Sequence, residues 1–246
     1  MTGYAARVDE RAGISRRETL AKLGGLLAGA VAVGGLKAAD SLAALDEEAA
    51  SSGPAGVASG AVRCVLAPEA TEGPFFLDDA SVRRNITEGK AGVPLTLRLA
   101  VVDVSTCKPI KGAVVDVWHC DAGGVYSGTS TQDALDDRFL RGLQRTNAKG
   151  VALFSTIYPG WYPGRTVHAH VMVHLGGNIV HTGQLYFADA VTDVVYKRRP
   201  YASRPSRNPR NAGDSIYRNG GKRSTLKLAR SGSGYLGSIT MGVQRS

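Results

Sequence analysis

A short apolar run at residues 167–173 constrains this chain most, because it carries His168 and His170 two residues apart. In a β-strand, residues two apart point to the same face, so both imidazoles would project together and could share one metal ion. Two Tyr-Pro-Gly units precede the run, and their turns would place a phenol and Arg165 beside that face. Imidazole binds zinc, copper, iron and nickel, whereas a phenolate favours ferric iron. The pattern also fits a half-buried strand with two polar residues on its wet face, so a metal site needs support from elsewhere.

Short runs rich in Val, Thr, Gly and Pro recur along the 246 residues and indicate an all-β fold. Long helical periodicity is scarce beyond the N-terminus. The alternation of strand and turn predicts a two-sheet β-sandwich with long loops. The expected strands cover residues 94–104, 113–119, 151–157, 167–173, 181–187 and 235–241.

The N-terminus has the pattern of an export signal. Arg16 and Arg17 precede a weakly apolar, Gly- and Ala-rich run at residues 20–36, as in a Tat signal, and small residues follow as a cleavage zone. The run is short and glycine-rich for a membrane span. We therefore expect export to the periplasm or the cell exterior without stable membrane insertion after cleavage; an uncleaved anchor is the alternative. The expected division is a signal peptide at 1–44, a linker at 45–61 and a folded domain at 62–246.

The formal net charge of +9 comes largely from a basic, turn-rich region at residues 197–230. A nucleic-acid surface would need interleaved aromatic residues and a known module, which are absent from the sequence, so we expect no nucleic-acid partner. An acidic substrate or partner is a second interpretation. A solvated, loop-rich surface is the interpretation that the composition favours.

Three cysteines, Cys64, Cys107 and Cys120, form no Cys-x-x-Cys motif. In an exported protein, one disulfide and one free thiol is the simplest arrangement, and the sequence does not determine the pairing. Because Cys120 ends an expected strand, we favour it as the free, buried thiol. A purely structural role as small buried residues is the alternative.

Two tyrosines and two histidines form the candidate metal-binding set: Tyr126, Tyr162, His168 and His170. Two phenolates and one hydroxide would balance the charge of a ferric ion. That balance matters because an uncompensated charge in a low-dielectric pocket is very costly.

The order of these motifs resembles a known family. Gly-x-Tyr is followed by Tyr-Pro-x-Arg-x-x-His-x-His and then Gly-Gln-x-Tyr-Phe, with Glu-Gly-Pro-Phe-Phe and Val-Asp-Val-Trp-His-Cys upstream. This order is similar to that of the intradiol ring-cleavage dioxygenases, which include protocatechuate, catechol and hydroxyquinol dioxygenases. The resemblance covers residues 64–187 and is weaker at 214–217 and in the last strand.

The resemblance implies roles for individual residues. Tyr126 and His168 would be equatorial ligands of Fe(3+), and Tyr162 and His170 the axial pair. Arg165 matches the family's active-site arginine, and Gln184 matches the glutamine near it. The residues expected to line the substrate pocket are Trp118, Phe75, Phe76 and Leu77. His119, His174 and His181 match no ligand position and are interpreted as structural.

The resemblance also implies a fold, a reaction and partners. The fold would be a prealbumin-like β-sandwich, and the reaction would cleave a catechol-type ring with O2 between its two hydroxylated carbons, giving a cis,cis-muconate-type diacid. The catechol dioxygenases of the family have an N-terminal helical dimerisation region, whereas a signal and a linker are expected there in this chain. The short, exported members are therefore the better match, and a homo-oligomer is an expectation that this difference weakens. A non-catalytic β-sandwich binding module that has lost its metal and a zinc hydrolase using His-x-His are the alternatives.

Overall fold

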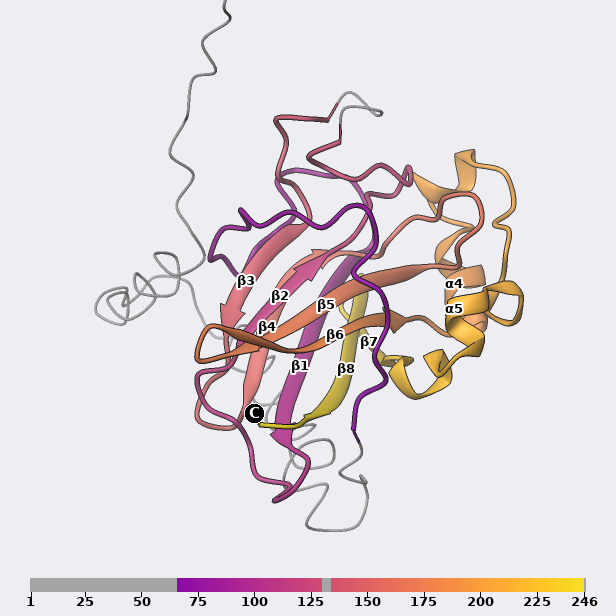
Figure 1. Cartoon of the computed structure of the whole chain (residues 1–246). Coiled ribbons are helices and arrows are strands. Elements are labelled where there is room, and N and C mark those ends of the chain that lie inside the picture. The colour runs from indigo at the N-terminus through magenta and orange to yellow at the C-terminus, as the bar shows by residue number, and fades with distance from the viewer. Residues whose placement is uncertain (1–65, 130–133, 246) are drawn as a thin grey trace, which may run out of the picture.

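The computed structural model describes residues 66–129 and 134–245, which form two four-stranded β-sheets packed face to face (Figure 1). The first sheet has the order β4-β1-β8-β7 and the second the order β3-β2-β5-β6. All neighbouring strands are antiparallel except β1 and β8. The predicted signal peptide, linker and Cys64 lie outside the described residues.

The strand boundaries largely follow the sequence pattern. The first sheet contains β1 (Pro94–Asp103), β4 (Val151–Ile157), β7 (Lys227–Ser231) and β8 (Gly234–Val243). The second contains β2 (Val114–Trp118), β3 (Arg141–Arg145), β5 (His168–Leu175) and β6 (Asn178–Tyr186). The prediction missed β3 and β7, whose short sequences, Arg-Gly-Leu-Gln-Arg and Lys-Leu-Ala-Arg-Ser, have many polar residues.

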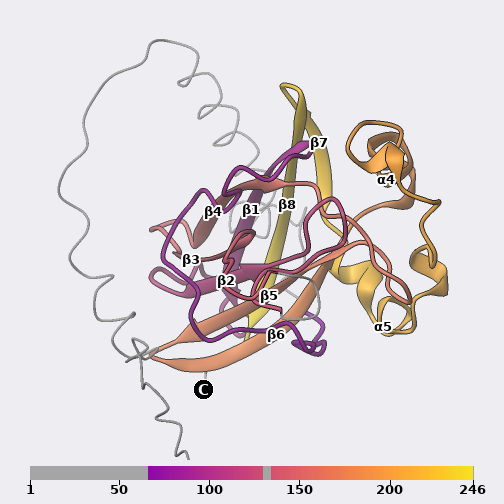
Figure 2. The ribbon, with the colours of Figure 1, turned by 90° about the horizontal axis from the view of Figure 1, so that it is seen from above.

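The core lies between the sheets. Leu97, Leu99 and Val101 alternate along β1 and are fully buried, and Val115 and Val117 do the same along β2. This two-residue period sends one side of each strand into a shared apolar layer, as in a sandwich of two aligned sheets. Figure 2 shows the two layers from above. The sandwich holds both β2 and β5 rigidly, and β5 is the strand of the two histidines.

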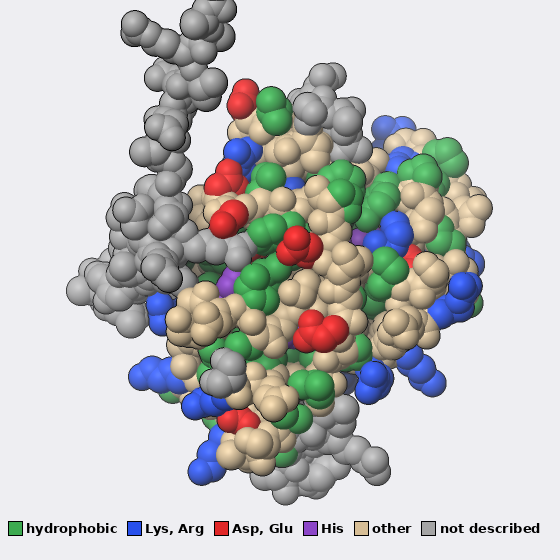
Figure 3. Space-filling view, in the orientation of Figure 1, with side chains coloured by type: hydrophobic (Ala, Val, Ile, Leu, Met, Phe, Trp, Pro, Cys, Tyr) green, Lys and Arg blue, Asp and Glu red, His purple; other side chains and the backbone are tan. Residues whose placement is uncertain are grey.

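The segment between β6 and β7 folds against one end of the sandwich (Figures 1 and 2). It contains α4 (Asp189–Val195), η2 (Tyr201–Ser203), η3 (Asn211–Gly213), α5 (Ser215–Arg218) and η4 (Gly221–Ser224). In the space-filling view, Lys and Arg side chains gather over this end of the molecule (Figure 3). No helix in the described ranges is long and apolar enough to cross a membrane.

The interpretation of this basic segment as a solvated surface is wrong for part of it. Tyr201, Asn211 and Asp214 are buried. Arg207 pairs with Asp189 and Asp193, two acids of α4. Part of the segment is therefore packed and ion-paired, and two of its polar side chains, Asn211 and Asp214, reach the site described below.

Candidate metal centre

The two histidines of β5 lie side by side as their spacing predicts. The ring centroids of His168 and His170 are 4.8 Å apart, and both side chains are buried. Within the sheet, His170 is paired with Trp118 of β2 and Gln184 of β6, and His168 with Tyr186. His170 thus has a strand neighbour on both sides, whereas His168 has one on the β6 side.

His168 has one ring nitrogen committed to the backbone. Its Nδ1 lies 2.6 Å from the carbonyl oxygen of Thr166, which only accepts, so Nδ1 carries the proton. The lone pair therefore sits on Nε2, which lies 3.1 Å from the Tyr162 hydroxyl. This arrangement directs a metal-binding lone pair and a phenol oxygen to the same place.

Tyr126 approaches from the loop after β2. Its ring is fully buried, with its centroid 5.7 Å from that of Tyr162 and 6.1 Å from that of His170. Gly124 permits this approach: its φ is +86°, and a Cβ there would lie 2.3 Å from the Trp161 carbonyl oxygen. The loops that carry the two tyrosines thus touch backbone to backbone, which a side chain at Gly124 would prevent.

His170 provides the test of whether the site suits a metal. Both of its ring nitrogens are buried, and neither has a hydrogen-bond partner among the described residues. A buried polar atom left unpaired costs about 1–3 kcal/mol, so such a histidine needs an explanation. Trp118 stacks on the ring at 4.9 Å with a 7° interplanar angle, which orients it without bonding either nitrogen. A metal ion bound by the imidazole would provide a partner for one of the two nitrogens.

Burial holds all four groups in their neutral forms in the metal-free protein. It raises the pKa of the Tyr126 phenol well above its usual value, and raises that of Tyr162, against which the charge of Arg165 acts. It lowers the pKa of His168 to about 3, with Arg165 adding to the effect, and that of His170 well below normal. Neutral imidazoles are ready to bind a metal, and a trivalent cation would favour the phenolates.

Arg165 lies beside this set in a network of fixed acceptors. Its Nε donates to Asp214 Oδ2 at 2.8 Å, and its Nη2 donates to Gln184 Oε1 at 2.5 Å. Gln184 Oε1 also accepts from Tyr186, and its Nε2 donates to the Thr71 carbonyl oxygen. Gln184 therefore connects the arginine to the loop that carries Phe75 and Phe76.

Asp214 is the residue of this network that the sequence reasoning missed. Its side chain is fully buried and caps α5 by accepting from the amides of Ile216 and Tyr217. The local signal was an N-cap pattern, Asp followed by a short helix. That pattern indicates a helix start and gives no sign of a partner such as Arg165.

The predicted pocket residues occupy different places. Phe75 stacks on Tyr126 with centroids 4.4 Å apart, and Phe76 meets Trp118 edge-on at 5.1 Å. Leu77 instead packs on Gly128, where an added Cβ would lie 2.2 Å from its Cδ1. The structure thus brings Phe75, Phe76 and Trp118 to the four candidate ligands, while Leu77 lies farther along the Tyr126 loop.

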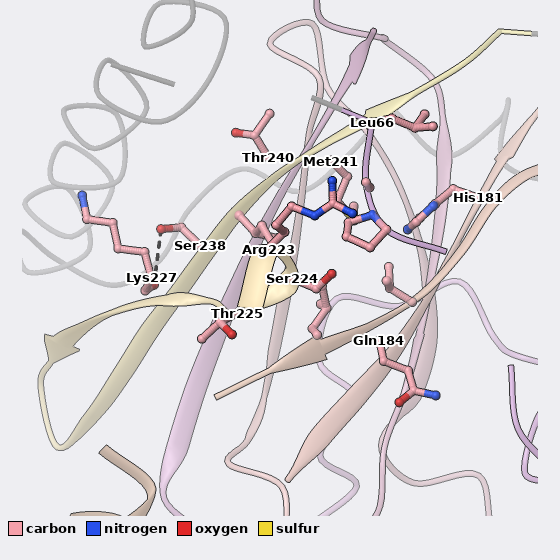
Figure 4. A pocket seen from close by; sticks show the side chains of 15 residues that line it. Leu66, His181, Gln184, Arg223, Ser224, Thr225, Lys227, Ser238, Thr240 and Met241 are labelled. Atoms are coloured by element: carbon pink, nitrogen blue, oxygen red, sulfur yellow. Dashed lines mark hydrogen bonds between the residues drawn. The ribbon is translucent and has the colours of Figure 1, made fainter. Parts of the chain in front are cut away.

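A cavity of about 360 Å³ lies on the other side of Gln184 (Figure 4). It is bounded by Leu66, His181, Arg223 and Met241 among others. In Figure 4 the amide of Gln184 points away from Arg223 and out of this cavity. The cavity is therefore separate from the side of Gln184 that bonds Arg165.

The remaining histidines and cysteines lie outside the candidate set. His119 uses both ring nitrogens, at 2.7 Å from the Cys120 carbonyl oxygen and 2.8 Å from Thr156 Oγ1. His181 pairs with Glu69, and His174 lies at the far end of β5. Cys120 is free and buried, as predicted. Cys107 is also free, so neither described cysteine forms the expected single disulfide, and Cys64 lies outside the described residues.

A zinc site of the usual composition is not formed by the described part of the chain. No group of three or more His, Cys, Asp and Glu side chains that could hold a metal occurs there. Structural and catalytic zinc sites draw at least three ligands from these residue types. The side chains that accompany the two histidines are instead the phenols of Tyr126 and Tyr162, and a site that includes both phenols is compatible with the geometry.

Comparisons with known proteins agree with this geometry. A family model described as Dioxygenase matches residues 71–192. The intradiol ring-cleavage dioxygenase from Tetranychus urticae is 37% identical, with a TM-score of 0.69 over 74% of this chain and 95% of that one. The dioxygenase domain of a carbohydrate-binding fusion protein from Streptomyces sp. SirexAA-E is 31% identical, with a TM-score of 0.59 over 74% of this chain and all of that one.

Curated relatives are similar over a shorter stretch. Catechol 1,2-dioxygenase 1 from Acinetobacter lwoffii is 34% identical over 101 residues, which are 39% of this chain and 32% of that protein. The chain spans about a third to a half of the length of the curated relatives that it matches first. The sandwich fold, the order of the motifs and the near-complete match to the Tetranychus urticae structure show that this chain belongs to the intradiol ring-cleavage dioxygenase family.

Proposed function

We propose that this protein is a non-haem Fe(III)-dependent intradiol dioxygenase that cleaves a catechol-type ring between its two hydroxylated carbons. Both atoms of O2 enter the product, a cis,cis-muconate-type diacid. The observation that carries the proposal is the convergence of two phenols and two imidazoles in one buried place. The names of the relatives, catechol and chlorocatechol 1,2-dioxygenases, support the substrate class.

Tyr126, Tyr162, His168 and His170 would hold the iron. The unpaired nitrogens of His170 and the lone pair of His168 Nε2, which faces the Tyr162 hydroxyl, fit a metal with nitrogen and oxygen ligands. Two phenolates supply the negative charge that a buried trivalent ion requires. Bound ferric iron would draw electron density from a chelated catechol and make its ring reactive towards O2.

The burial of the two tyrosines differs, which supports different roles for them. Tyr126 is fully buried under Phe75, whereas Tyr162 is only partly buried and lies next to Arg165. Tyr162 is therefore the phenol that can move aside, and its Oη would accept one proton of the incoming catechol. Tyr126 would stay in place.

Arg165 would supply positive charge where the ring gains electron density. Its guanidinium is held by Asp214 and Gln184, so little reorganisation accompanies the reaction. Phe75, Phe76 and Trp118 present apolar faces that would exclude water and limit which ring substituents fit.

The proposal is tested by measuring oxygen uptake on a panel of catechols while iron is quantified in the same sample. We expect a coloured, iron-containing protein that consumes O2 with at least one catechol. Replacing Tyr162 by Phe should abolish turnover and change the visible band, because a phenolate ligand and a base are lost together. An iron-free, colourless protein without oxygen uptake would instead support the non-catalytic binding module.

Export by the Tat route and self-association are further parts of this proposal. The twin arginines Arg16 and Arg17 support export. Replacing both by Lys should leave the protein in the cytoplasm. Unchanged export of that variant would contradict the Tat route. Sedimentation of the purified protein tests whether it forms a homo-oligomer.

A further inference from the structure

We propose that Asp214 is a positioning residue, whose single carboxylate sets both the Arg165 guanidinium and the start of the strand that carries the histidines. The inference rests on the proposed function for its effect on turnover. The claim that Asp214 holds the Arg165 guanidinium in one position does not depend on that function.

Asp214 is saturated with donors. Oδ2 accepts from Arg165 Nε and from the Thr166 amide, both at 2.8 Å, and Oδ1 accepts from the amides of Ile216 and Tyr217 at 2.8 and 2.9 Å. The side chain is fully buried, and these bonds hold its pKa below the usual value although burial opposes them. A carboxylate with this many donors remains charged and has one orientation.

The two bonds of Oδ2 lead to different parts of the site. One fixes the Nε side of Arg165, whose Nη2 is fixed in turn by Gln184. The other fixes the amide of Thr166, whose carbonyl oxygen accepts from His168 Nδ1. One carboxylate therefore determines where the positive charge lies and how the backbone that orients His168 enters β5.

A second hydrogen bond, from the side chain of Thr166 to Asn211, also holds the residue that precedes β5. Thr166 Oγ1 lies 2.7 Å from Asn211 Oδ1, and Asn211 Nδ2 donates to the Phe187 carbonyl oxygen. Asn211 and Asp214 both belong to the basic segment between β6 and β7. That segment thus acts on the site through two buried polar side chains, and its surface cations take no part in this contact.

Asp214→Asn is the principal variant. An amide offers one acceptor oxygen and turns two donors towards groups that are themselves donors, so the four N–H groups lose part of their bonding. A displacement of about 1 Å in a catalytic group costs roughly 100-fold in rate. We expect kcat to fall about 100-fold with KM changed less than about threefold, because Asp214 acts on the charge of Arg165 and does not touch the substrate.

The matched control is Asp193→Asn. Asp193 also accepts from arginines of the same segment, Arg207 and Arg210, but does so away from the metal centre. This variant should keep kcat within about twofold of the parent protein. Equal losses of kcat in the two variants would overturn the proposal, because the effect would then come from a general loss of ion pairs.

A double-mutant cycle separates positioning from general damage. The part of the effect that passes through Arg165 should vanish in an Arg165→Ala background, so Asp214→Asn should cost kcat at most about tenfold there, through Thr166 and His168. Fully multiplicative losses would overturn the role. Should Asp214→Asn fail to fold, Asp214→Glu keeps the charge but displaces it by one methylene. It should lower kcat about tenfold or more at unchanged iron content, and parent-like kcat would overturn the role.

A spectroscopic measurement keeps this test independent of turnover. In ¹H–¹⁵N spectra of the metal-free protein, the Nε–H of Arg165, identified by its loss in Arg165→Lys, should exchange slowly with solvent. The signal should persist in Asp193→Asn and exchange rapidly in Asp214→Asn or Asp214→Glu. A slowly exchanging signal in the Asp214 variants contradicts the positioning role, even if no catechol is turned over and the proposed function itself fails.

Discussion

The side chains on the two flanks of the candidate metal centre are held in place by different kinds of interaction. On the His168 flank, hydrogen bonds run from the imidazole to the Thr166 carbonyl and from the Thr166 amide to Asp214. On the His170 flank, aromatic rings pack against one another: Trp118 stacks on His170, and Phe75 stacks on Tyr126. Hydrogen bonds therefore orient the ring of His168, and the packing of aromatic rings orients the ring of His170.

The buried histidines differ in how their ring nitrogens are hydrogen-bonded. His119 has both ring nitrogens bonded by groups outside the candidate set. His168 bonds the backbone through Nδ1 and the phenol of Tyr162, itself a candidate ligand, through Nε2. His170 has neither nitrogen bonded within the described ranges. A structural histidine bonds groups outside a metal site with both nitrogens, whereas a ligand keeps one or both directed at the metal position. Ring packing can therefore hold a ligand without using its lone pairs.

The largest expected effect is the loss of iron when either candidate ligand histidine is replaced, and the two histidines also differ in the absence of metal. His168→Leu and His170→Leu should both lose iron and colour, because each removes a ligand. In the metal-free protein, His168→Leu should lower the free energy of unfolding by about 1–3 kcal/mol, since the Thr166 carbonyl oxygen loses its donor. His170→Leu should be neutral or stabilising, since it removes an unpaired buried imidazole. Thermal melts with iron analysis check this, and equal destabilisation by the two would break the comparison.

Gly124→Ala tests the backbone contact that places Tyr126. The positive φ alone should cost about 1–2 kcal/mol. The clash of the new Cβ with the Trp161 carbonyl should add about 1–3 kcal/mol and reduce iron content. Gly89→Ala is the control, because its φ is +75° but nothing lies within 4 Å of the added Cβ. Denaturant melts and iron analysis compare the two, and parent-like iron content in Gly124→Ala would show that the loop contact does not place Tyr126.

Trp118→Phe weakens the ring-packed flank without changing any ligand. The smaller ring should stack less well on His170, at a cost of about 1–2 kcal/mol in unfolding free energy. Iron affinity should fall by about tenfold, as expected when a group that orients a ligand is altered. Competition with a chelator measures the affinity, and an unchanged value would show that the stack is dispensable.

The smallest effect concerns His119, the fully bonded histidine. Burial lowers its pKa to about 4, so between about pH 6.5 and 4 the unfolded chain binds a proton that the folded protein does not. Stability therefore falls as pH falls through this range, by at most about 1.4 kcal/mol per pH unit from this residue. His119→Gln should show a shallower slope in denaturant melts of the metal-free protein. A slope equal to that of the parent would assign the dependence to other groups.

The sequence predicted the parts of the site that are local. The His-x-His pattern in an apolar run predicts β5 and the shared face, and the alternation elsewhere predicts the two-sheet sandwich. The four candidate ligands were recognised by their order along the chain, and the structure brings them together. These signals are strong because the two-residue period of a strand and the order of motifs can both be read directly from one sequence.

The rest depended on contacts between distant segments. Asp214 reads as a helix cap, and only the packed fold shows that its other oxygen holds Arg165. The basic segment reads as solvated because its acids, Asp189 and Asp193, lie earlier in the chain. Leu77 packs on Gly128, two residues after Tyr126, and its place in a substrate pocket stays a prediction.

Resonance Raman spectroscopy of the iron-loaded protein tests whether both phenols bind the iron, because excitation in the visible band enhances vibrations of iron-bound phenolates. We expect signals from two different tyrosinates, of which one set disappears in Tyr126→Phe and the other in Tyr162→Phe. A spectrum without tyrosinate bands, or one that neither substitution changes, would contradict a ferric centre built from these two residues.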